Sequence, residues 1–540
     1  MAAFQKNQIV DLTIEGYGTS GEGIAHLPDN MACFVAGGLR GEVCAVRLDK
    51  VGRSAAWGHV ERVLTPSPAR LKPDCPYYVN CGGCAARHMT YAEELEFKRQ
   101  KVADCVKRIG GCDTPVEAIC GAKEPERYRN KVQFPAAGGK IGFYAARTHS
   151  VTDVADCLLQ PESAARIRSV VKDFMSTYHV TYYDEKTGKG LLRHLYVRSN
   201  RAGETLVCLL VNGKALPHEE ELVAALRQAE PGLRGVVLGV NLSRSNVILG
   251  ESYRTLWGED HLMDTLCGLE FRLSVPSFYQ VNPDQTEVLY GLAVDYAGLT
   301  GTETVLDLYC GIGTITLCLA RKAKKAIGAE VVPQAIEDAK ANALRYGLHN
   351  TEFFCGDAGE VALRFAREGV RPDVITVDPP RKGLAAEVVE AIARMAPARV
   401  VYVSCDPATL ARDIAGFAEQ GYQPQKITAV DLFPRTHHVE AVCLLSKLNA
   451  KQHIEINLDM DELDLTDAEK KATYQEIKDY VLEHSGLKVS SLYIAQVKQQ
   501  CGIIERENYN KPKFEDTKQP QCPSDKEKAI KEALRYFGMI

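Results

Sequence analysis

Hydrophobic residues alternate with polar ones in several short runs near the amino terminus. Val10, Leu12 and Ile14 form one such run, and glycine-rich turns such as Gly37-Gly38 separate the runs. Short alternating strands between glycine turns are typical of a small antiparallel barrel of the OB type. Residues 1–62 are therefore predicted to form a barrel. Such barrels often bind RNA, although the pattern would equally suit a barrel that serves only for packing.

The pattern changes between residue 70 and about residue 260, where helical and strand-like segments are mixed. A helix rich in charged residues is expected over 91–109, and the stretch 190–250 alternates like strands. An α+β domain is predicted here. Its run Arg127–Lys131 is basic with one aromatic residue, which suits phosphate binding and base stacking, or else a solvated surface.

Residues 261–448 alternate apolar strand runs with helical segments, the signature of a doubly wound α/β sheet of the Rossmann type. From residue 449 to residue 540 the pattern predicts a small helical extension of three short helices. Ile477 and Val481 share one face of the first helix, and Gly486 is expected to end it. Two serine or threonine residues that precede glutamate by three positions are predicted helix caps: Thr466 and Ser524.

Composition narrows the class of protein. A chain of 540 residues needs several domains, and a net charge of −5 excludes a generally basic nucleic-acid coat but not a local RNA-binding surface. No signal peptide and no apolar run long enough for a membrane span is found, which predicts a cytoplasmic protein without a membrane partner. Most of the 18 cysteines are then expected to be free thiols, and a few to bind metal or to act in catalysis.

Three cysteines, Cys75, Cys81 and Cys84, are spaced Cys-x5-Cys-x2-Cys, and Gly82-Gly83 permits a tight turn between the last two. An iron–sulfur cluster needs a fourth thiolate, for which Cys157 is the best candidate. Its competitors are Cys105, Cys112 and Cys120. A zinc ribbon would need a second Cys-x2-Cys pair, which the sequence lacks, yet spacing alone leaves zinc or no metal open.

A glycine-rich turn follows the first strand of the α/β part. Gly311-x-Gly313 lets a ligand approach the backbone, and the helix that begins there offers free amide donors. Glu330 ends the next strand, where an acidic residue binds a ribose diol, and Asp357 follows a further strand and is placed to face an adenine amino group. Because no phosphate loop is present, S-adenosylmethionine fits better than ATP, and NAD is the alternative for this fold.

Cys405 follows an apolar strand run and precedes a helical pattern, so it is expected at the carboxyl end of a buried strand. Its neighbours are turn formers, unlike those of a cysteine that is only a small buried hydrophobe: Ser404, Asp406 and Pro407. A thiolate that adds to carbon 6 of uracil makes carbon 5 nucleophilic toward a sulfonium methyl group, and Glu440 would then remove the hydrogen on carbon 5. This requires a cysteine of low pKa. Cys310 is a rival nucleophile, but it is expected to pack inside the cofactor loop.

Several motifs together resemble the RNA uridine-5-methyltransferase family: DLYCGIGT, DPPRKG, SCDPATLARD, FPRTHHVE and, upstream, SFYQVN. The resemblance covers residues 1 to about 448 and implies that Cys405 is the nucleophile and Glu440 the base. It also implies a pocket for cofactor and uracil formed by Gln280, Tyr309, Thr314, Glu330, Asp357 and Asp378. Asp406 is a departure, because several family members carry asparagine there, and it is expected to change a local hydrogen bond rather than the reaction.

Two other stretches carry resemblances of their own. Gly16-Tyr17-Gly18 with Gly21–Ala25 is similar to the opening of the TRAM domain, an RNA-binding barrel appended to RNA-modifying enzymes. The cysteine phrase Cys75–Cys84 with one distant cysteine resembles the iron–sulfur uridine methyltransferases of 23S ribosomal RNA and implies a four-iron four-sulfur (4Fe-4S) cluster.

These resemblances imply S-adenosylmethionine-dependent methylation of carbon 5 of a specific uridine in 23S ribosomal RNA, through a covalent cysteine–uracil adduct. The alternatives are methylation of a transfer RNA uridine and a non-catalytic RNA-binding protein that keeps only the fold.

Overall fold

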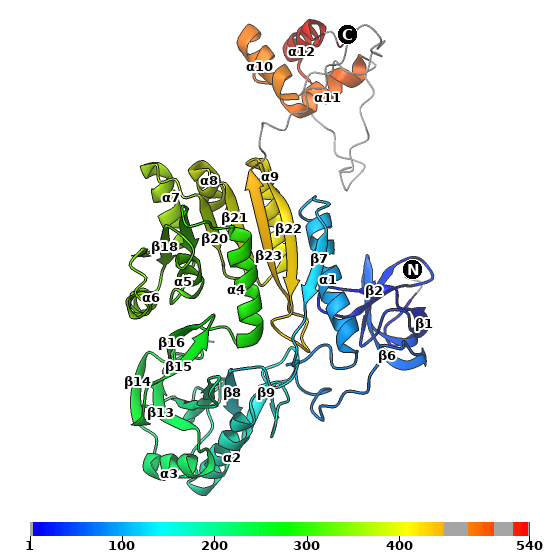
Figure 1. The fold of residues 1–540 in the computed structure, drawn as a ribbon. Coiled ribbons are helices and arrows are strands. Elements are labelled where there is room, and N and C mark those ends of the chain that lie inside the picture. The colour runs from blue at the N-terminus through cyan, green and yellow to red at the C-terminus, as the bar shows by residue number, and fades with distance from the viewer. Residues whose placement is uncertain (1–3, 246, 448–473, 502–521, 538, 540) are drawn as a thin grey trace. The chain divides into compact units, whose positions relative to one another are not determined.

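The computed structural model describes residues 4–245, 247–447, 474–501, 522–537 and 539 (Figure 1). The chain divides into two compact units, Met1–Asn449 and Ala450–Ile540. Within the described ranges, no helix is both long enough and apolar enough to cross a membrane.

The amino-terminal part of the first unit is a curled six-stranded sheet in the order β1-β5-β6-β4-β3-β2. Its strands are β1 (Ile9–Thr13), β2 (Gly16–Tyr17), β3 (Gly23–His26), β4 (Ala32–Ala36), β5 (Val43–Val51) and β6 (Ala55–Thr65). Alternate residues such as Leu12, Val35 and Val46 form its core. The expectation of a wholly antiparallel barrel is wrong in one pair: β6 turns back from β5 and then lies parallel to β4.

The central part is a mixed seven-stranded sheet in the order β10-β9-β8-β11-β12-β13-β14, in which only β12 and β13 run parallel. Its strands are β8 (Lys131–Ala137), β9 (Lys140–Tyr144), β10 (Val151–Asp153), β11 (Leu192–Ser199), β12 (Thr205–Val211), β13 (Leu233–Val240) and β14 (Ser252–Gly258). Two helices, α2 (Glu162–Thr177) and α3 (Glu219–Ala229), bury apolar residues such as Ile167 and Leu222 against the sheet. A hairpin of β15 (His261–Leu266) and β16 (Leu269–Ser274) follows.

The third part is an eight-stranded sheet in the order β19-β18-β17-β20-β21-β23-β22-β7. Its strands are β7 (Val116–Cys120), β17 (Thr304–Leu308), β18 (Lys325–Glu330), β19 (Thr351–Cys355), β20 (Val374–Val377), β21 (Arg399–Ser404), β22 (Tyr422–Val430) and β23 (Glu440–Lys447). Neighbours run parallel except β23, which is antiparallel to β21 and β22. The chain winds outward from β17 in one direction and then in the other. The point where it reverses, between β17 and β20, is where such sheets bind their ligands.

Helices cover both faces of this sheet, which confirms the predicted doubly wound fold. One face carries α1 (Tyr91–Arg108), α7 (Ala358–Glu368), α8 (Ala386–Met395) and α9 (Pro407–Glu419). The other carries α4 (Pro283–Ala297), α5 (Thr314–Ala320) and α6 (Pro333–Arg345).

Two elements of this third part come from far upstream in the chain. β7 lies at the edge of the sheet, parallel to β22, with Ala118 opposite Thr428 (Figure 1). α1 buries Val102 and Val106 in the same core as α9. Both elements precede the central sheet in the sequence, so the central part is inserted between pieces that pack together.

The second unit contains α10 (Tyr474–Ser485), α11 (Ser491–Gln500) and α12 (Ser524–Tyr536), as predicted. Ile477 and Val481 lie in its core, and Gly486 follows the end of α10 at φ +70°. The predicted cap at Ser524 is wrong. Pro523 occupies the capping position and has no side-chain acceptor, so Ser524 is already helical. The cap predicted at Thr466 lies outside the described residues.

Candidate active site

The carboxyl ends of the parallel strands surround one cavity of about 710 Å3. Tyr309 and Gly311 follow β17, Glu330 ends β18, Asp378 follows β20 and Cys405 follows β21, and all of them line it. Because β23 runs antiparallel, Glu440 at its start reaches the same edge. The volume falls in the range of small-molecule and cofactor sites.

The turn that carries Cys405 is built as the sequence predicts. β21 ends at Ser404, whose hydroxyl accepts a hydrogen bond from the Asp406 amide at 3.2 Å. Asp406 caps α9 by accepting from the amides of Ala408 at 2.9 Å and Thr409 at 3.3 Å. Asparagine caps helices equally well, so the difference between Asp406 and the asparagine of several family members affects the cap of α9 and not a reacting group.

The expectation that Cys405 has a low pKa is wrong for the free protein. Burial, together with the negative charges of Glu440 and Asp378, raises the pKa of the Cys405 thiol to about 11, and Arg381 opposes this only in part. The carboxylates that make the site suitable for a cation therefore disfavour a thiolate when no cation is bound.

Glu440 is a buried carboxyl group with only 2 % of its surface exposed. Burial and the charge of Asp378 raise the pKa of Glu440 to about 8, while Arg381 lowers it. Burial and Asp307 raise the pKa of Asp378 to about 7. A carboxyl group whose pKa lies near neutrality is suited to take up and release a proton during a reaction.

The loop after β17 adopts the conformation that a close ligand requires. Tyr309, Gly311 and Gly313 all have positive φ, at +69°, +56° and +84°. Glu330 holds this loop, because its carboxylate accepts from the amides of Gly311 at 3.1 Å and Val332 at 3.0 Å. Glycine tolerates positive φ without strain, whereas the tyrosine must be held there by its surroundings.

Most of the predicted cofactor residues gather around this loop, with one exception. Gln280, Tyr309, Glu330 and Asp378 line the cavity, and Thr314 lines a smaller adjoining cavity together with Tyr290. Asp357 lines neither of the two. It caps α7 by accepting from the amides of Gly359 at 2.9 Å and Glu360 at 3.2 Å. Burial, together with the charge of Asp357, raises the pKa of Tyr309.

Several further residues that were not singled out from the sequence line the main cavity, among them Arg381, Phe433 and His438. Arg381, Phe433 and His438 lie in the motifs DPPRKG and FPRTHHVE, so these motifs could have identified them from the sequence. The positive charge of Arg381 offsets part of the rise that burial and the neighbouring carboxylates cause in the pKa of both Cys405 and Glu440. Burial and the neighbouring His437 lower the pKa of His438 to about 3, so its ring is neutral and adds no positive charge.

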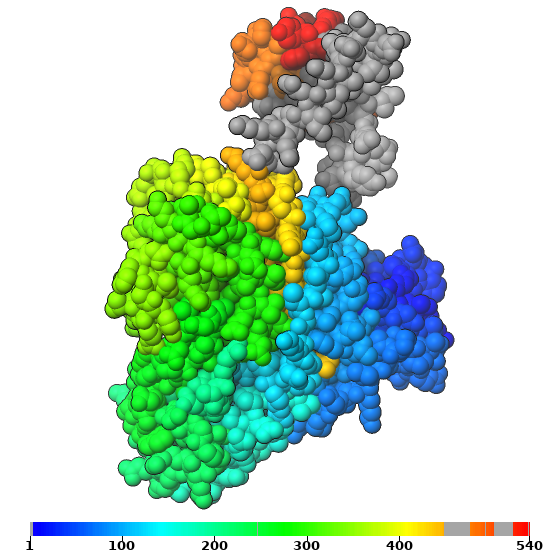
Figure 2. All heavy atoms as spheres, in the orientation of Figure 1, coloured from blue at the N-terminus to red at the C-terminus, as the bar shows by residue number. Residues whose placement is uncertain are grey.

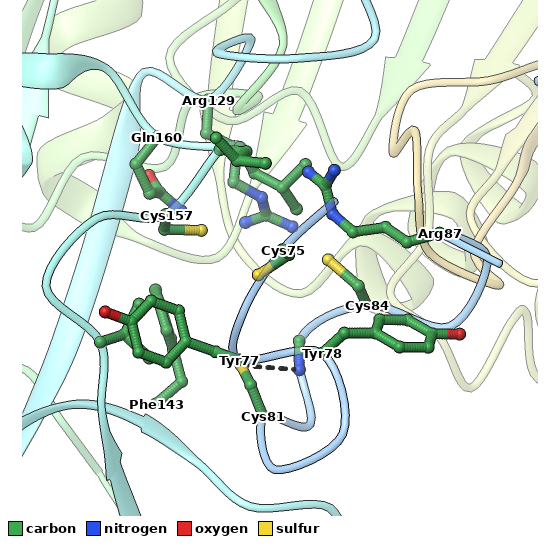
Figure 3. Close-up of a pocket in the computed structure, with 14 residues that line it drawn as sticks. Cys75, Tyr77, Tyr78, Cys81, Cys84, Arg87, Arg129, Phe143, Cys157 and Gln160 are labelled. Carbon is green, nitrogen blue, oxygen red and sulfur yellow. Dashed lines mark hydrogen bonds between the residues drawn. The ribbon is translucent and has the colours of Figure 1, made fainter. Parts of the chain in front are cut away.

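The four predicted metal-binding cysteines line one separate cavity of about 160 Å3 (Figure 3): Cys75, Cys81, Cys84 and Cys157. The Gly83 amide lies 3.4 Å from the Cys81 sulfur, as a tight Cys-x2-Cys loop requires. None of the competing cysteines lines this cavity. Across the described parts of the chain, no three ligand side chains converge on a single metal ion.

Comparisons with known proteins agree with this geometry. Residues 254–448 match the family model described as tRNA (Uracil-5-)-methyltransferase, and residues 3–60 match that of the TRAM domain. A protein from Clostridium tetani called an uncharacterized RNA methyltransferase is 44 % identical over 453 residues, which cover 83 % of this chain and 98 % of the relative. A protein of the same description from Halalkalibacterium halodurans is 42 % identical over 454 residues, covering 83 % and 99 %.

A solved structure is similar over the whole of its own length. It is the Pyrococcus abyssi tRNA (uracil-54, C5)-methyltransferase in complex with S-adenosyl-L-homocysteine, with a TM-score of 0.65 and 26 % identity. The match covers 81 % of this chain and 100 % of that structure. The chain therefore belongs to the RNA uracil-5-methyltransferase family, and it is an enzyme of that family with a TRAM domain at its amino terminus.

Proposed function

We propose that this enzyme methylates carbon 5 of a uridine in RNA through a covalent adduct between Cys405 and the uracil ring. The observation that carries the proposal is the single cavity that Cys405 and Glu440 share with the glycine-rich loop after β17. A base inside a duplex cannot enter such a cavity, so the target uridine must leave its stack.

The residues divide the chemistry between them. The Cys405 sulfur bonds to carbon 6 of the ring, carbon 5 takes the methyl group, Glu440 removes the proton on carbon 5, and the sulfur then leaves. S-adenosylmethionine supplies the methyl group and a positive charge when bound. A positive charge beside Glu440 and Asp378 offsets the field that raises the pKa of Cys405, so the thiolate is favoured when the cofactor site is filled.

The residues proposed to hold the cofactor are Gln280, Tyr309, Thr314, Glu330, Asp357 and Asp378. In this proposal Glu330, the last residue of β18, binds the ribose hydroxyls, and Asp357, two residues beyond β19, binds the adenine amino group. The similar tRNA methyltransferase structure, which holds S-adenosyl-L-homocysteine, supports this assignment.

We further propose that Cys75, Cys81, Cys84 and Cys157 hold a 4Fe-4S cluster. A single zinc ion would need thiolates about 2.3 Å from the metal and hence about 3.8 Å from one another, and the four thiols do not converge in this way. The cavity suits a larger anionic group, because Arg87 lines it and no described residue accepts a hydrogen bond from its buried Nε atom. When bound, the cluster would tie the loop before α1 to the loop after β10.

The proposed substrate is 23S ribosomal RNA in the cytoplasm, because the cysteine phrase and the TRAM domain stand together in this chain. The solved relative acts on transfer RNA, which makes that the alternative. Mass spectrometry of both RNAs from a deletion strain distinguishes them: loss of 5-methyluridine from transfer RNA alone would exclude the ribosomal substrate.

Two variants test the mechanism. Cys405→Ala should end methylation while S-adenosylmethionine still binds, since the thiol takes part in the reaction and not in cofactor binding. Glu440→Gln should trap the covalent RNA–protein adduct, visible as a band of lower mobility on a denaturing gel. Methylation by the alanine variant, or full turnover by the glutamine variant without an adduct, would reject the roles proposed for these residues.

A further inference from the structure

The loop that delivers Glu440 to the cavity connects β22 to β23 and comprises residues 431–439, here called the base loop. It carries unusual backbone strain, because Arg435 has φ +68°. A non-glycine residue holds this conformation only where its surroundings impose it. Phe433 and His438 of the same loop line the catalytic cavity.

Buried charges on α1 fix the start of the base loop. The Lys98 ammonium donates to Asp431 at 2.6 Å, to Glu94 at 2.7 Å and to the Phe433 carbonyl at 3.1 Å. Lys98, Glu94 and Asp431 are fully buried. The amide of Arg435 in turn donates to Glu94 at 2.6 Å. Breaking such a buried network is costly, so the loop and α1 are held as one piece.

The loop that carries the metal-binding cysteines also holds the base loop directly. The amides of Ala85 and Ala86, which follow Cys84, both donate to the Arg435 carbonyl, at 2.9 Å and 3.1 Å. Arg87 lines the cysteine cavity and donates to Glu126 at 2.5 Å, and the other oxygen of Glu126 accepts from Arg435 Nε at 3.0 Å.

A second connection runs through the segment 127–130. The amides of Arg127 and Arg129 donate to the carbonyls of Leu158 and Leu159, just after Cys157, at 2.7 Å and 3.0 Å. The Arg129 guanidinium lines the cysteine cavity and lies 5.9 Å from the centre of the Phe433 ring.

The neighbours of Arg129 extend this connection toward the catalytic cavity. The Tyr128 hydroxyl donates to the Pro434 carbonyl at 3.1 Å. Asn130 donates through its amide to Val281 at 2.8 Å and through its side chain to the Gln280 carbonyl at 3.0 Å. Figure 2 shows a small gold patch surrounded by blue atoms. Gold marks the part of the chain that includes the base loop, and blue marks the upstream part that contacts it.

We propose that the centre formed by Cys75, Cys81, Cys84 and Cys157 positions the catalytic base, Glu440. It holds the base loop in place through Ala85–Arg87 and through Arg129. Arg435 is the positioning residue, because it receives the backbone bonds from Ala85 and Ala86 and the contact with Glu126. The inference rests on the proposed role of Glu440. It gives the proposed cluster a task in the reaction without any electron transfer. The cluster would fix the loop after Cys84, which contacts the base loop directly, and the loop after Cys157, which reaches the base loop through residues 127–130. Weakening the contacts that hold the base loop should impair removal of the proton from carbon 5 and not the binding of RNA.

The test is Glu126→Gln, which keeps the shape of the side chain but removes the charge shared by Arg87 and Arg435. We expect kcat to fall about tenfold to a hundredfold with little change in the KM for RNA, because small displacements of a catalytic group cost that much. The covalent adduct should accumulate during turnover, and bound iron should stay at the level of the unaltered protein.

The matched control is Glu219→Gln. Glu219, the first residue of α3, pairs with both terminal nitrogens of Arg254 on β14, and its side chain is 30 % exposed against 32 % for Glu126. This variant should leave kcat and the adduct level unchanged. If Glu126→Gln fails to fold, Arg129→Lys serves instead, since lysine keeps the positive charge but loses the guanidinium group that lies 5.9 Å from the centre of the Phe433 ring.

A second measurement does not depend on activity. Hydrogen exchange of the peptide 431–439 is compared between the iron-containing protein and Cys84→Ser, in which the proposed cluster cannot form fully. We expect faster exchange in the base loop without iron. Unchanged exchange there, wild-type kcat in Glu126→Gln, or an effect confined to KM would each overturn the inference. If instead Glu440→Gln traps no adduct, the proposed function fails, while the exchange result still reports whether the cysteine centre holds the loop.

Discussion

Replacing Glu440 with glutamine should make the free protein increasingly more stable than the wild type as the pH rises. The pKa of Glu440 is about 8 in the folded protein, against 4.5 for an unperturbed glutamate. Between these values the folded protein holds a proton that the unfolded chain has released, so the stability of the wild type falls with rising pH. Each pKa unit corresponds to about 1.4 kcal/mol. As the pH rises from about 5.5 to about 8.5, the ionisation of Glu440 therefore lowers the free energy of unfolding of the wild type by about 3 kcal/mol. Glutamine does not ionise, so the variant does not lose this stability.

Calorimetric melting curves of both proteins at these two pH values, without cofactor, measure the effect. The difference in Tm, variant minus wild type, should grow by roughly 3 °C. The unit Met1–Asn449 unfolds with an entropy of about 2.1 cal/mol/K per residue, so each kcal/mol shifts its Tm by about 1 °C. Glu219→Gln is the control: Arg254 holds the pKa of Glu219 below its usual value, so its trend with pH should be small and of opposite sign. A Tm difference that does not change with pH would show that Glu440 is not kept protonated by burial beside Asp378.

Two further predictions concern the cofactor site. Glu330→Gln should weaken binding of S-adenosyl-L-homocysteine about tenfold in calorimetric titration, because a charged acceptor for the ribose hydroxyls is lost; unchanged affinity would assign Glu330 only to holding the Gly311 and Val332 amides. Asp357→Ser should keep the cap of α7, since serine caps helices well, while it weakens the same binding about tenfold. If affinity is retained in that variant, Asp357 is a helix cap and nothing more.

The sequence predicts well those features that depend on neighbouring residues. The turn at Cys405 is confirmed, because Ser404 and Asp406 make their hydrogen bonds within a few positions of the cysteine. The winding of the sheet is confirmed for the same reason, since strand and helix patterns alternate locally. The four cysteines singled out from their spacing and from the family resemblance line one cavity, although Cys157 is distant in sequence from the other three.

Features that depend on residues distant in the sequence could not be predicted. The pKa of Cys405 is set by Glu440 and Asp378, which reach it only in the folded sheet, so the expectation of a low pKa was wrong. The strand β7 gives no sign in its own residues that its partner is β22. The bonds from Ala85 and Ala86 to Arg435 are made by backbone amides, which no side-chain pattern records.

The edge position of β7 limits how the catalytic part can be separated from the rest. A fragment that begins at residue 261 would lack both β7 and α1, and it would leave the edge of β22 unpaired and the core around Val102 and Val106 uncovered. Unpaired edges beside exposed apolar surface favour aggregation. A stable fragment of the catalytic part should therefore include residues 91–120, which pair with β22 and complete the core around α9.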